Sequence, residues 1–246
     1  MKASVSPAAV VFAFLLGFTA ASAQAQDVVV QKDGQRREGQ IQAVKSGALR
    51  IKIGPAETGI PMANVASVIM APPKDFDEAL ALWNKGDAAK ALAKVRPLVE
   101  KYPALPTKWA ERAAALLGEC LLGTGDVAGA EAAFANFQRD YPAAGSSADV
   151  GLARLAVEKK DYATARAKLA PIVEAARKTP LARPGDSAVF GQALYLIGRV
   201  QEAAGENSEA LENYLLAANL FREDLFSAAR AAERAAALKE KNVIVP

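Results

Sequence analysis

The sequence contains no histidine and only one cysteine, Cys120, among its 246 residues. Histidine is the commonest general base and metal ligand near neutral pH, so its absence excludes Ser-His and Cys-His nucleophilic sites. A single cysteine forms neither an intramolecular disulfide nor a zinc site. No phosphate-binding loop is present, and no dinucleotide-binding glycine pattern follows a strand. These absences predict a protein that is not an enzyme and that binds no metal or other cofactor.

Two groups of residues keep some chemistry open. Cys120 lies in an apolar helical run, which favours a buried, inert thiol over a reactive one. Asp75, Asp77 and Glu78 form the densest acidic cluster, and they stand where a helix is expected to begin. Carboxylates at that position are better explained by helix capping and by the positive end of the helix dipole than by catalysis.

A large excess of charge of one sign is also lacking. The 30 Lys and Arg residues against 27 Asp and Glu residues give a formal net charge of +3. Nucleic acids and anionic membranes require a clustered basic face, so neither is a predicted partner. Aromatic residues make up 7% of the chain, whereas alanine and leucine dominate, and this composition is typical of packed helices.

The one long apolar run lies at the N-terminus. Residues 8–18 (AAVVFAFLLGF) follow Lys2 and precede A-x-A patterns at 21–23 and 23–25. This layout predicts a signal peptide over residues 1–25 and a periplasmic or secreted location. The run is shorter than the roughly 20 residues of a bilayer span, so no stable membrane span is expected after cleavage. No cysteine lies near the cleavage region, which disfavours a lipoprotein; an uncleaved anchor is the alternative.

Residues 27–70 have the pattern of a small β module. Strands are expected at 27–31, 38–44, 48–53, 58–62 and 65–70, separated by turn signals such as Asp33-Gly34. Five short strands suit a small all-β barrel or meander rather than a sandwich. The module loosely resembles the SH3-like and Sm-like mini-barrels, which implies that it caps a neighbouring array or binds a peptide at its edge. Residues 71–74 (APPK) form the expected linker.

From residue 75 onward the apolar spacing becomes helical and a pattern repeats. An alanine stands five residues after the first residue of each turn segment, at intervals of roughly 35 to 45 residues. A small residue always lies twelve positions before this alanine, and a large apolar residue lies four positions after it. Antiparallel helices pack closely where one offers Gly or Ala and the other inserts a large side chain. The four alanines are Ala91, Ala130, Ala165 and Ala210.

The pattern over residues 75–222 resembles the tetratricopeptide repeat (TPR). The second copy carries the resemblance best, through Gly118, Gly125, Ala130, Phe134 and Pro142. The third copy lacks both glycines, and the fourth lacks the closing proline. The resemblance implies a mainly α fold: a right-handed α-solenoid of four helical hairpins, followed by a capping helix over 224–241. A generic array of α-hairpins is the alternative.

The resemblance also implies a concave groove, lined by the first helix of each hairpin, that accepts a peptide. The charged residues expected there are of both signs and lie beside aromatic anchors. Simple packing in the core or between repeats is the alternative for Trp83 and Tyr195. The predicted partner-binding residues are Trp83, Asn84, Glu119, Arg154, Glu158, Tyr195, Arg199 and Glu202.

Two functions follow as hypotheses. The first is an exported scaffold or adaptor that binds a protein or peptide partner through the groove. The second is a structural envelope protein that self-associates into homo-oligomers through its apolar C-terminal helix, without a peptide ligand.

Overall fold

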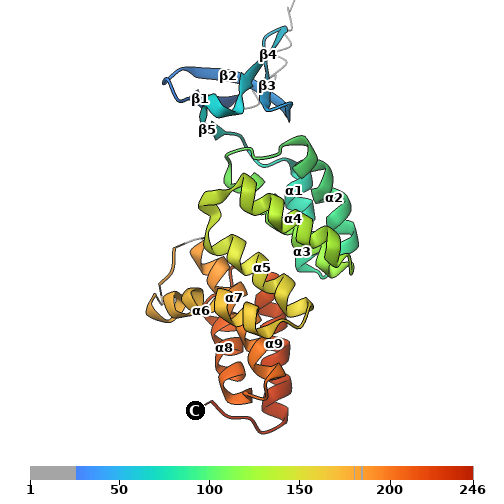
Figure 1. Ribbon diagram of the computed structural model, residues 1–246, viewed down its shortest axis with the longest axis vertical. Helices are drawn as coiled ribbons and strands as arrows, with labels where there is room; N and C mark the ends of the chain where they lie inside the picture. Colours follow the sequence, from blue (N-terminus) through green and yellow to red (C-terminus); the bar gives the residue numbers. More distant parts are fainter. Residues whose placement is uncertain (1–25, 180, 184, 246) are drawn as a thin grey trace, which may run out of the picture.

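The computed structural model describes residues 26–179, 181–183 and 185–245 (Figure 1). The predicted signal peptide, residues 1–25, lies outside the described residues. The chain is mainly helical and begins with an antiparallel sheet of five strands, as the sequence predicts. In Figure 1 the sheet lies at one end of the molecule and the C-terminus near the other.

All five predicted strands are confirmed: β1 and β3 have the predicted bounds, and the other three differ from theirs by one or two residues. Their order across the sheet is β4-β3-β2-β1-β5, and every neighbouring pair is antiparallel. A short 3-10 helix, η1 (Met62–Asn64), joins the last two strands. The strands are β1 (Asp27–Gln31), β2 (Arg36–Lys45), β3 (Ala48–Ile53), β4 (Ala56–Pro61) and β5 (Val65–Ile69).

The long strand β2 bends and thereby curves the sheet. Its first half pairs with β1, where Gly39 lies opposite Asp27, and its second half pairs with β3. The pairing register shifts between Ile41 and Ala43, as at a β-bulge, which bends a strand. A Cβ at Gly39 would lie 2.4 Å from the backbone oxygen of Lys52, so the bend requires glycine there.

The helices follow in antiparallel pairs: α1 with α2, α3 with α4, α5 with α6, and α7 with α8. A further helix, α9, packs on α8 and α7. The helices are α1 (Lys74–Asn84), α2 (Ala88–Lys101), α3 (Lys108–Gly123), α4 (Val127–Asp140), α5 (Ser146–Glu158), α6 (Tyr162–Lys178), α7 (Asp186–Ala203), α8 (Asn207–Asn219) and α9 (Leu225–Glu240), with a 3-10 turn, η2 (Pro142–Ala144), after α4.

The predicted packing of small against large residues is confirmed. A Cβ at Gly118 of α3 would lie 2.5 Å from the ring of Phe134 on α4, and one at Gly151 of α5 would lie 2.7 Å from the same ring. The Phe134 ring therefore packs between α3 and α5, and both helices can approach it this closely only because they have glycine at the contact. Gly198 and Tyr214 repeat this contact in the fourth pair, at 2.5 Å.

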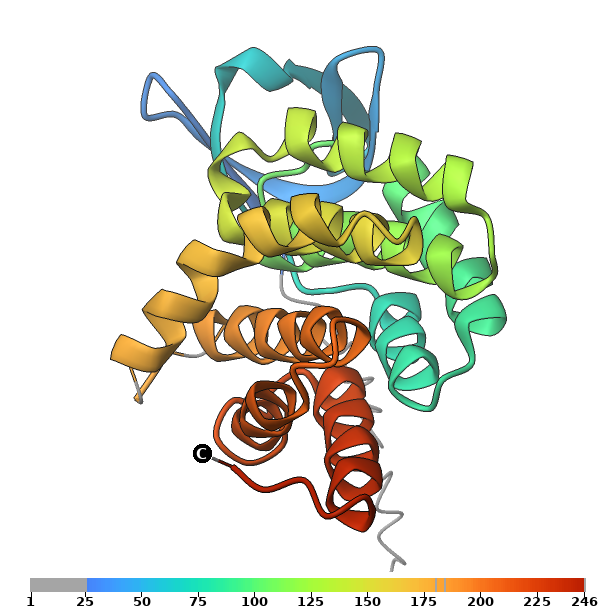
Figure 2. The ribbon, with the colours of Figure 1, turned by 60° about the horizontal axis from the view of Figure 1, so that its bottom comes forward.

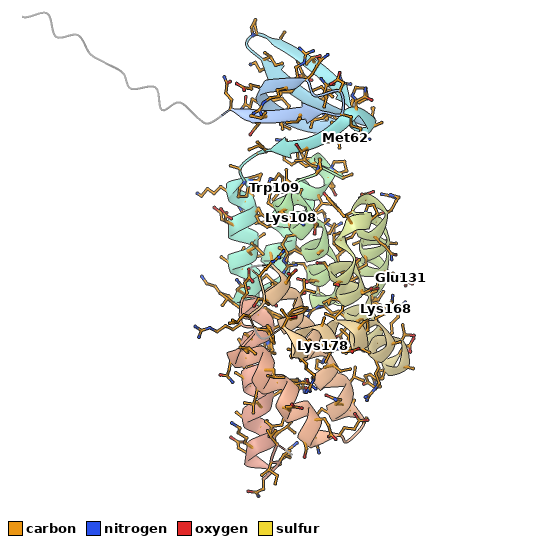
Figure 3. The ribbon with its side chains drawn as sticks, turned by 90° about the vertical axis from the view of Figure 1, so that its left-hand side faces the viewer. Met62, Lys108, Trp109, Glu131, Lys168 and Lys178 are labelled. Carbon is orange, nitrogen blue, oxygen red and sulfur yellow. The ribbon has the colours of Figure 1, made fainter. Side chains whose placement is uncertain are left out.

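Two large apolar clusters form the core. One extends from the β sheet through α1, α2 and α3, and the other runs from α5 to α9. Met62 and Trp109 lie at the junction of the sheet with the helices (Figure 3). Because the first cluster is continuous across this junction, the sheet and the first hairpins share one core.

Candidate functional site

The first helix of each hairpin contacts its counterpart in the next, so α1, α3, α5 and α7 lie side by side. These four are called the inner helices. Leu80, Glu119, Arg154 and Arg199 occupy the same repeat position on successive inner helices. Charged residues of both signs are therefore placed at one level, as the repeat register predicts.

Helix α9 packs against two of the inner helices, α7 and α1. Its C-terminal half packs on α7 and α8, and its first turn reaches back to α1 (Figure 2). There the Phe226 ring stacks on Trp83 with 4.3 Å between ring centroids and 28° between ring planes. At the same end, an Asp224 carboxylate oxygen lies 3.7 Å from Nη2 of Arg112 on α3. The C-terminal helix is thus packed against the first hairpin as well as the last.

The structure places half of the predicted groove residues in the interior. Trp83, Glu119, Arg154 and Tyr195 are buried. Asn84, Arg199 and Glu202 are half-buried, and Glu158 is exposed. Both rings take part in packing, which is the alternative considered for them above. The Trp83 ring lies against Phe226, and the Tyr195 ring lies beside Tyr214 with 6.2 Å between ring centroids.

Most charged groups along the inner helices are paired. Arg199 of α7 donates to Glu158 of α5 over 2.7 Å, which links two hairpins. Arg112 donates to Glu119 over 3.0 Å on the same helix. Burial disfavours the charge of Arg112, but Glu119 and Asp224 together hold its pKa above the ordinary value.

A polar chain connects α9 to α7 and α8. Glu202 accepts hydrogen bonds from the Tyr214 hydroxyl and from Arg234 of α9, each over 2.8 Å. Burial, followed by the neighbouring Glu202 carboxylate, raises the pKa of Tyr214, so its hydroxyl stays protonated and donates. These contacts anchor the middle of α9.

Arg154 is the exception. It is 5% exposed, and its Nε and Nη2 have no hydrogen-bond partner in the part of the chain that is described. The repeat register gives the reason: Arg199 reaches Glu158 of the preceding hairpin, but the residue equivalent to Glu158 in the hairpin before Arg154 is Gly123. A Cβ at Gly123 would lie 2.7 Å from Ala88 Cβ and 3.3 Å from the Trp83 ring, so no carboxylate fits there.

Sequence reasoning missed the part that α9 plays at this site. The residues concerned are Arg112, Asp224, Phe226 and Arg234. Two signals were present in the sequence. Arg112 precedes Glu119 by two helical turns and so shares its face, and Phe226 is the only aromatic residue in 224–241.

Cys120 and the acidic cluster at the start of α1, the two groups considered above for possible catalysis, lie in environments that suit a structural role. Cys120 is buried, as expected, and burial raises the pKa of its thiol to about 12, so the nucleophilic thiolate is disfavoured. Lys94 bridges Asp75 and Glu78 with contacts of 2.8 and 2.7 Å, so two of the three carboxylates at the start of α1 are paired. Among the described residues, no group of three or more potential metal ligands comes together.

Comparisons of the chain with family models, with curated proteins and with solved structures gave no match. In the described ranges, none of the helices combines the length and the apolar character that crossing a membrane requires.

Proposed function

We propose that this protein is an exported adaptor that binds a protein or peptide partner through the concave side of a TPR-like, right-handed array, with the inner helices forming that side. The observation that carries the proposal is the repeated contact between hairpins: Gly118 and Gly198 receive Phe134 and Tyr214 at matching positions. This regular stacking aligns Glu158 and Arg199 on neighbouring inner helices, where both retain exposed surface. Aligned charges of both signs suit recognition of a polar peptide.

The curved five-stranded module fits this proposal as an SH3-like or Sm-like cap on the array. Its inner face merges with the core of the first hairpins. A sheet that shares its core with the array covers an end that would otherwise expose apolar surface, as terminal caps of repeat arrays do.

Site-specific photo-crosslinking tests the adaptor proposal. A photoreactive residue at position 158, on α5, should crosslink a partner in cell-envelope extract, whereas one at Glu100, exposed on α2, should not. Arg199→Glu should weaken the crosslink from position 158, because it reverses one charge of the surface beside that position. Equal crosslinking from both positions, or crosslinking from Glu100 alone, would exclude the concave side as the binding surface.

Export is a separate part of the proposal. It rests on residues 1–25, and N-terminal sequencing of the protein recovered from the envelope tests it. Cleavage after residue 23 or 25 is expected. Recovery of the intact N-terminus in the membrane fraction would favour the uncleaved anchor instead.

Self-association has one observation in its favour. Leu181 and Leu225 are 92% and 58% exposed, and the loop that carries Leu181 is joined to the segment just before α9 where Glu223 accepts from the backbone N–H of Gly185. Ala231, Ala235 and Leu238 of α9 are buried within the chain, so the exposed leucines, Leu181 and Leu225, would have to form the contact. Light scattering after size exclusion decides: a monomer at all concentrations excludes self-association.

A further inference from the structure

The first turn of α9 sits against the first two hairpins in the way a bound peptide would. It offers one carboxylate, Asp224, to Arg112 and one aromatic ring, Phe226, to Trp83. The residue between them, Leu225, points away, since its side chain is largely exposed. An acidic residue and an aromatic residue spaced by one position thus provide the contacts of this turn with α1 and α3.

This contact is narrow and imperfectly matched. The Arg112–Asp224 distance of 3.7 Å is too long for a hydrogen bond. Trp83 Nε1 and the Oγ of Ser227, which follows Phe226 in the chain, are buried without a hydrogen-bond partner in the described ranges. Unsatisfied buried polar groups disfavour the closed arrangement.

Arg230 on the second turn of α9 lies over the Phe226 ring, but the helix beyond Arg230 is held by contacts that do not involve the first turn. Ala231, Ala235 and Leu238 belong to the C-terminal core, and Arg234 donates to Glu202. Phe226, in contrast, packs against the cluster of the β sheet and the first hairpins. The first turn can therefore leave Trp83 while the remainder of α9 stays in place.

Arg154 is a further cation on the inner helices, and among the described residues no carboxylate pairs with it. It lies on α5, which contacts α3, the helix that carries Arg112. An arginine guanidinium carries its positive charge also where it is buried, so leaving it without a carboxylate partner is costly. A carboxylate from outside the chain would satisfy it, whereas the first turn of α9 does not.

We propose that the first turn of α9 is an internal ligand and that it identifies the partner's chemistry. The partner segment is an acidic peptide with a carboxylate two residues before an aromatic ring. On binding, its carboxylate replaces Asp224 on Arg112, its ring replaces Phe226 on Trp83, and a further acidic side chain pairs with Arg154. This inference rests on the proposed function, since it names what the concave side binds. The internal ligand lowers the apparent affinity for the external one until it is displaced.

Fluorescence anisotropy with a labelled peptide of residues 222–233 of this chain (REDLFSAARAAE) tests the proposal. The purified protein carrying Asp224→Asn and Phe226→Ala should bind this peptide at least tenfold more tightly than the unaltered protein. The same peptide with both substitutions should not bind. Equal binding of the peptide by both proteins, or equal binding of the two peptides, would overturn the proposal.

Tryptophan fluorescence gives a second measurement. In a Trp109→Phe background Trp83 is the only tryptophan, and Phe226→Ala should make it more accessible to acrylamide. Added peptide should restore its protection. Leu225→Ala is the matched control, since its side chain is exposed, and it should change nothing. If Phe226→Ala prevents folding, Phe226→Leu takes its place. Unchanged quenching in a folded variant would show a fixed cap and overturn the proposal.

The two proposals fail separately. If the peptide binds as expected but no partner crosslinks from position 158, the adaptor role fails and the internal ligand stands. If a partner crosslinks there but the peptide binds to neither protein, the concave side recognises different chemistry and the internal ligand is refuted.

Discussion

At the scale of single residues, the turn inside each hairpin depends on one left-handed position. Gly86, Gly125 and Gly205 occupy it with φ between +81° and +83°, which glycine adopts without steric cost. In the third hairpin the same position is Lys160, with φ +60°. A lysine there brings its Cβ close to the backbone, so this turn is strained where the other three are not.

Replacing Lys160 with glycine should therefore stabilise the protein by about 0.5–1 kcal/mol, because relief of the left-handed strain exceeds the added flexibility of the unfolded chain. Urea denaturation measures the change. The reciprocal substitution Gly125→Lys should destabilise by a similar or larger amount. A loss of stability in Lys160→Gly would contradict the assigned strain.

Close approach at Gly118 leads to a second prediction. A methyl group there would meet the Phe134 ring, so Gly118→Ala should cost about 1–3 kcal/mol in spite of the better helix propensity of alanine. Phe134→Leu shortens the opposing side chain and should recover part of that loss in the double variant. A double-mutant cycle by urea denaturation measures the coupling, and purely additive effects would refute the contact.

At the scale of elements, the second helix of the first three hairpins and α9 start in the same way. Asp87, Asp126, Asp161 and Asp224 each accept a hydrogen bond from a backbone N–H three residues on. Helix α8 differs, because Glu206 stands at its N-cap and its carboxylate binds Arg166 in two contacts of 3.0 and 2.9 Å. The stability of the first turn of each of these four aspartate-capped helices therefore depends on the protonation state of one carboxyl group.

The cap at Asp161 predicts a pH dependence. Hydrogen bonds from the Thr164 side chain and backbone hold the pKa of Asp161 below its ordinary value of 3.8. The stabilisation is then present above that ordinary value and is lost as the pH falls through the lowered one. Asp161→Asn keeps a capping oxygen that does not titrate. The melting temperature of the variant should therefore fall less than that of the unaltered protein below about pH 4. Parallel curves down to pH 2 would exclude this contribution.

The elements were largely predictable because their signals are local. Alternation in residues 48–53 specifies β3, and the Gly-Asp turns specify where paired helices end and begin. The prolines at 103 and 142 follow α2 and α4 as expected. The position of α9 against α1 could not be predicted in this way. It depends on how the rotations between hairpins add up over the array, and no short pattern encodes that sum.

At the scale of the whole molecule, the contact of α9 with α1 joins the two halves of the core. The sheet and first hairpins form one apolar cluster and the last hairpins another, and Phe226 of α9 packs into the first while Ala231 packs into the second. The repeat register correctly placed Glu158 and Arg199 together. It did not reveal that Trp83 is covered, because the covering ring of Phe226 lies more than a hundred positions away in the sequence.

A substitution of Arg154 should change the stability of the whole molecule and its binding of a partner in opposite directions. The Nε and Nη2 of Arg154 are buried without a hydrogen-bond partner among the described residues, which lowers the stability of the unliganded fold. Arg154→Met removes the charge and keeps most of the side-chain volume. It should raise the free energy of unfolding by about 1–4 kcal/mol. Arg199→Met is the matched control: its charge is paired with Glu158 over 2.7 Å, and its removal should give no such gain.

If Arg154 is kept for an acidic ligand, the same substitution should weaken the crosslink from position 158 although the protein has become more stable. A gain in stability with a loss of binding is the pattern expected of a residue retained for function rather than for folding. Urea denaturation and the crosslinking yield, measured on one preparation, give both quantities. A destabilised Arg154→Met variant would instead mean that the guanidinium stabilises the fold, and the argument from its missing partner would fail.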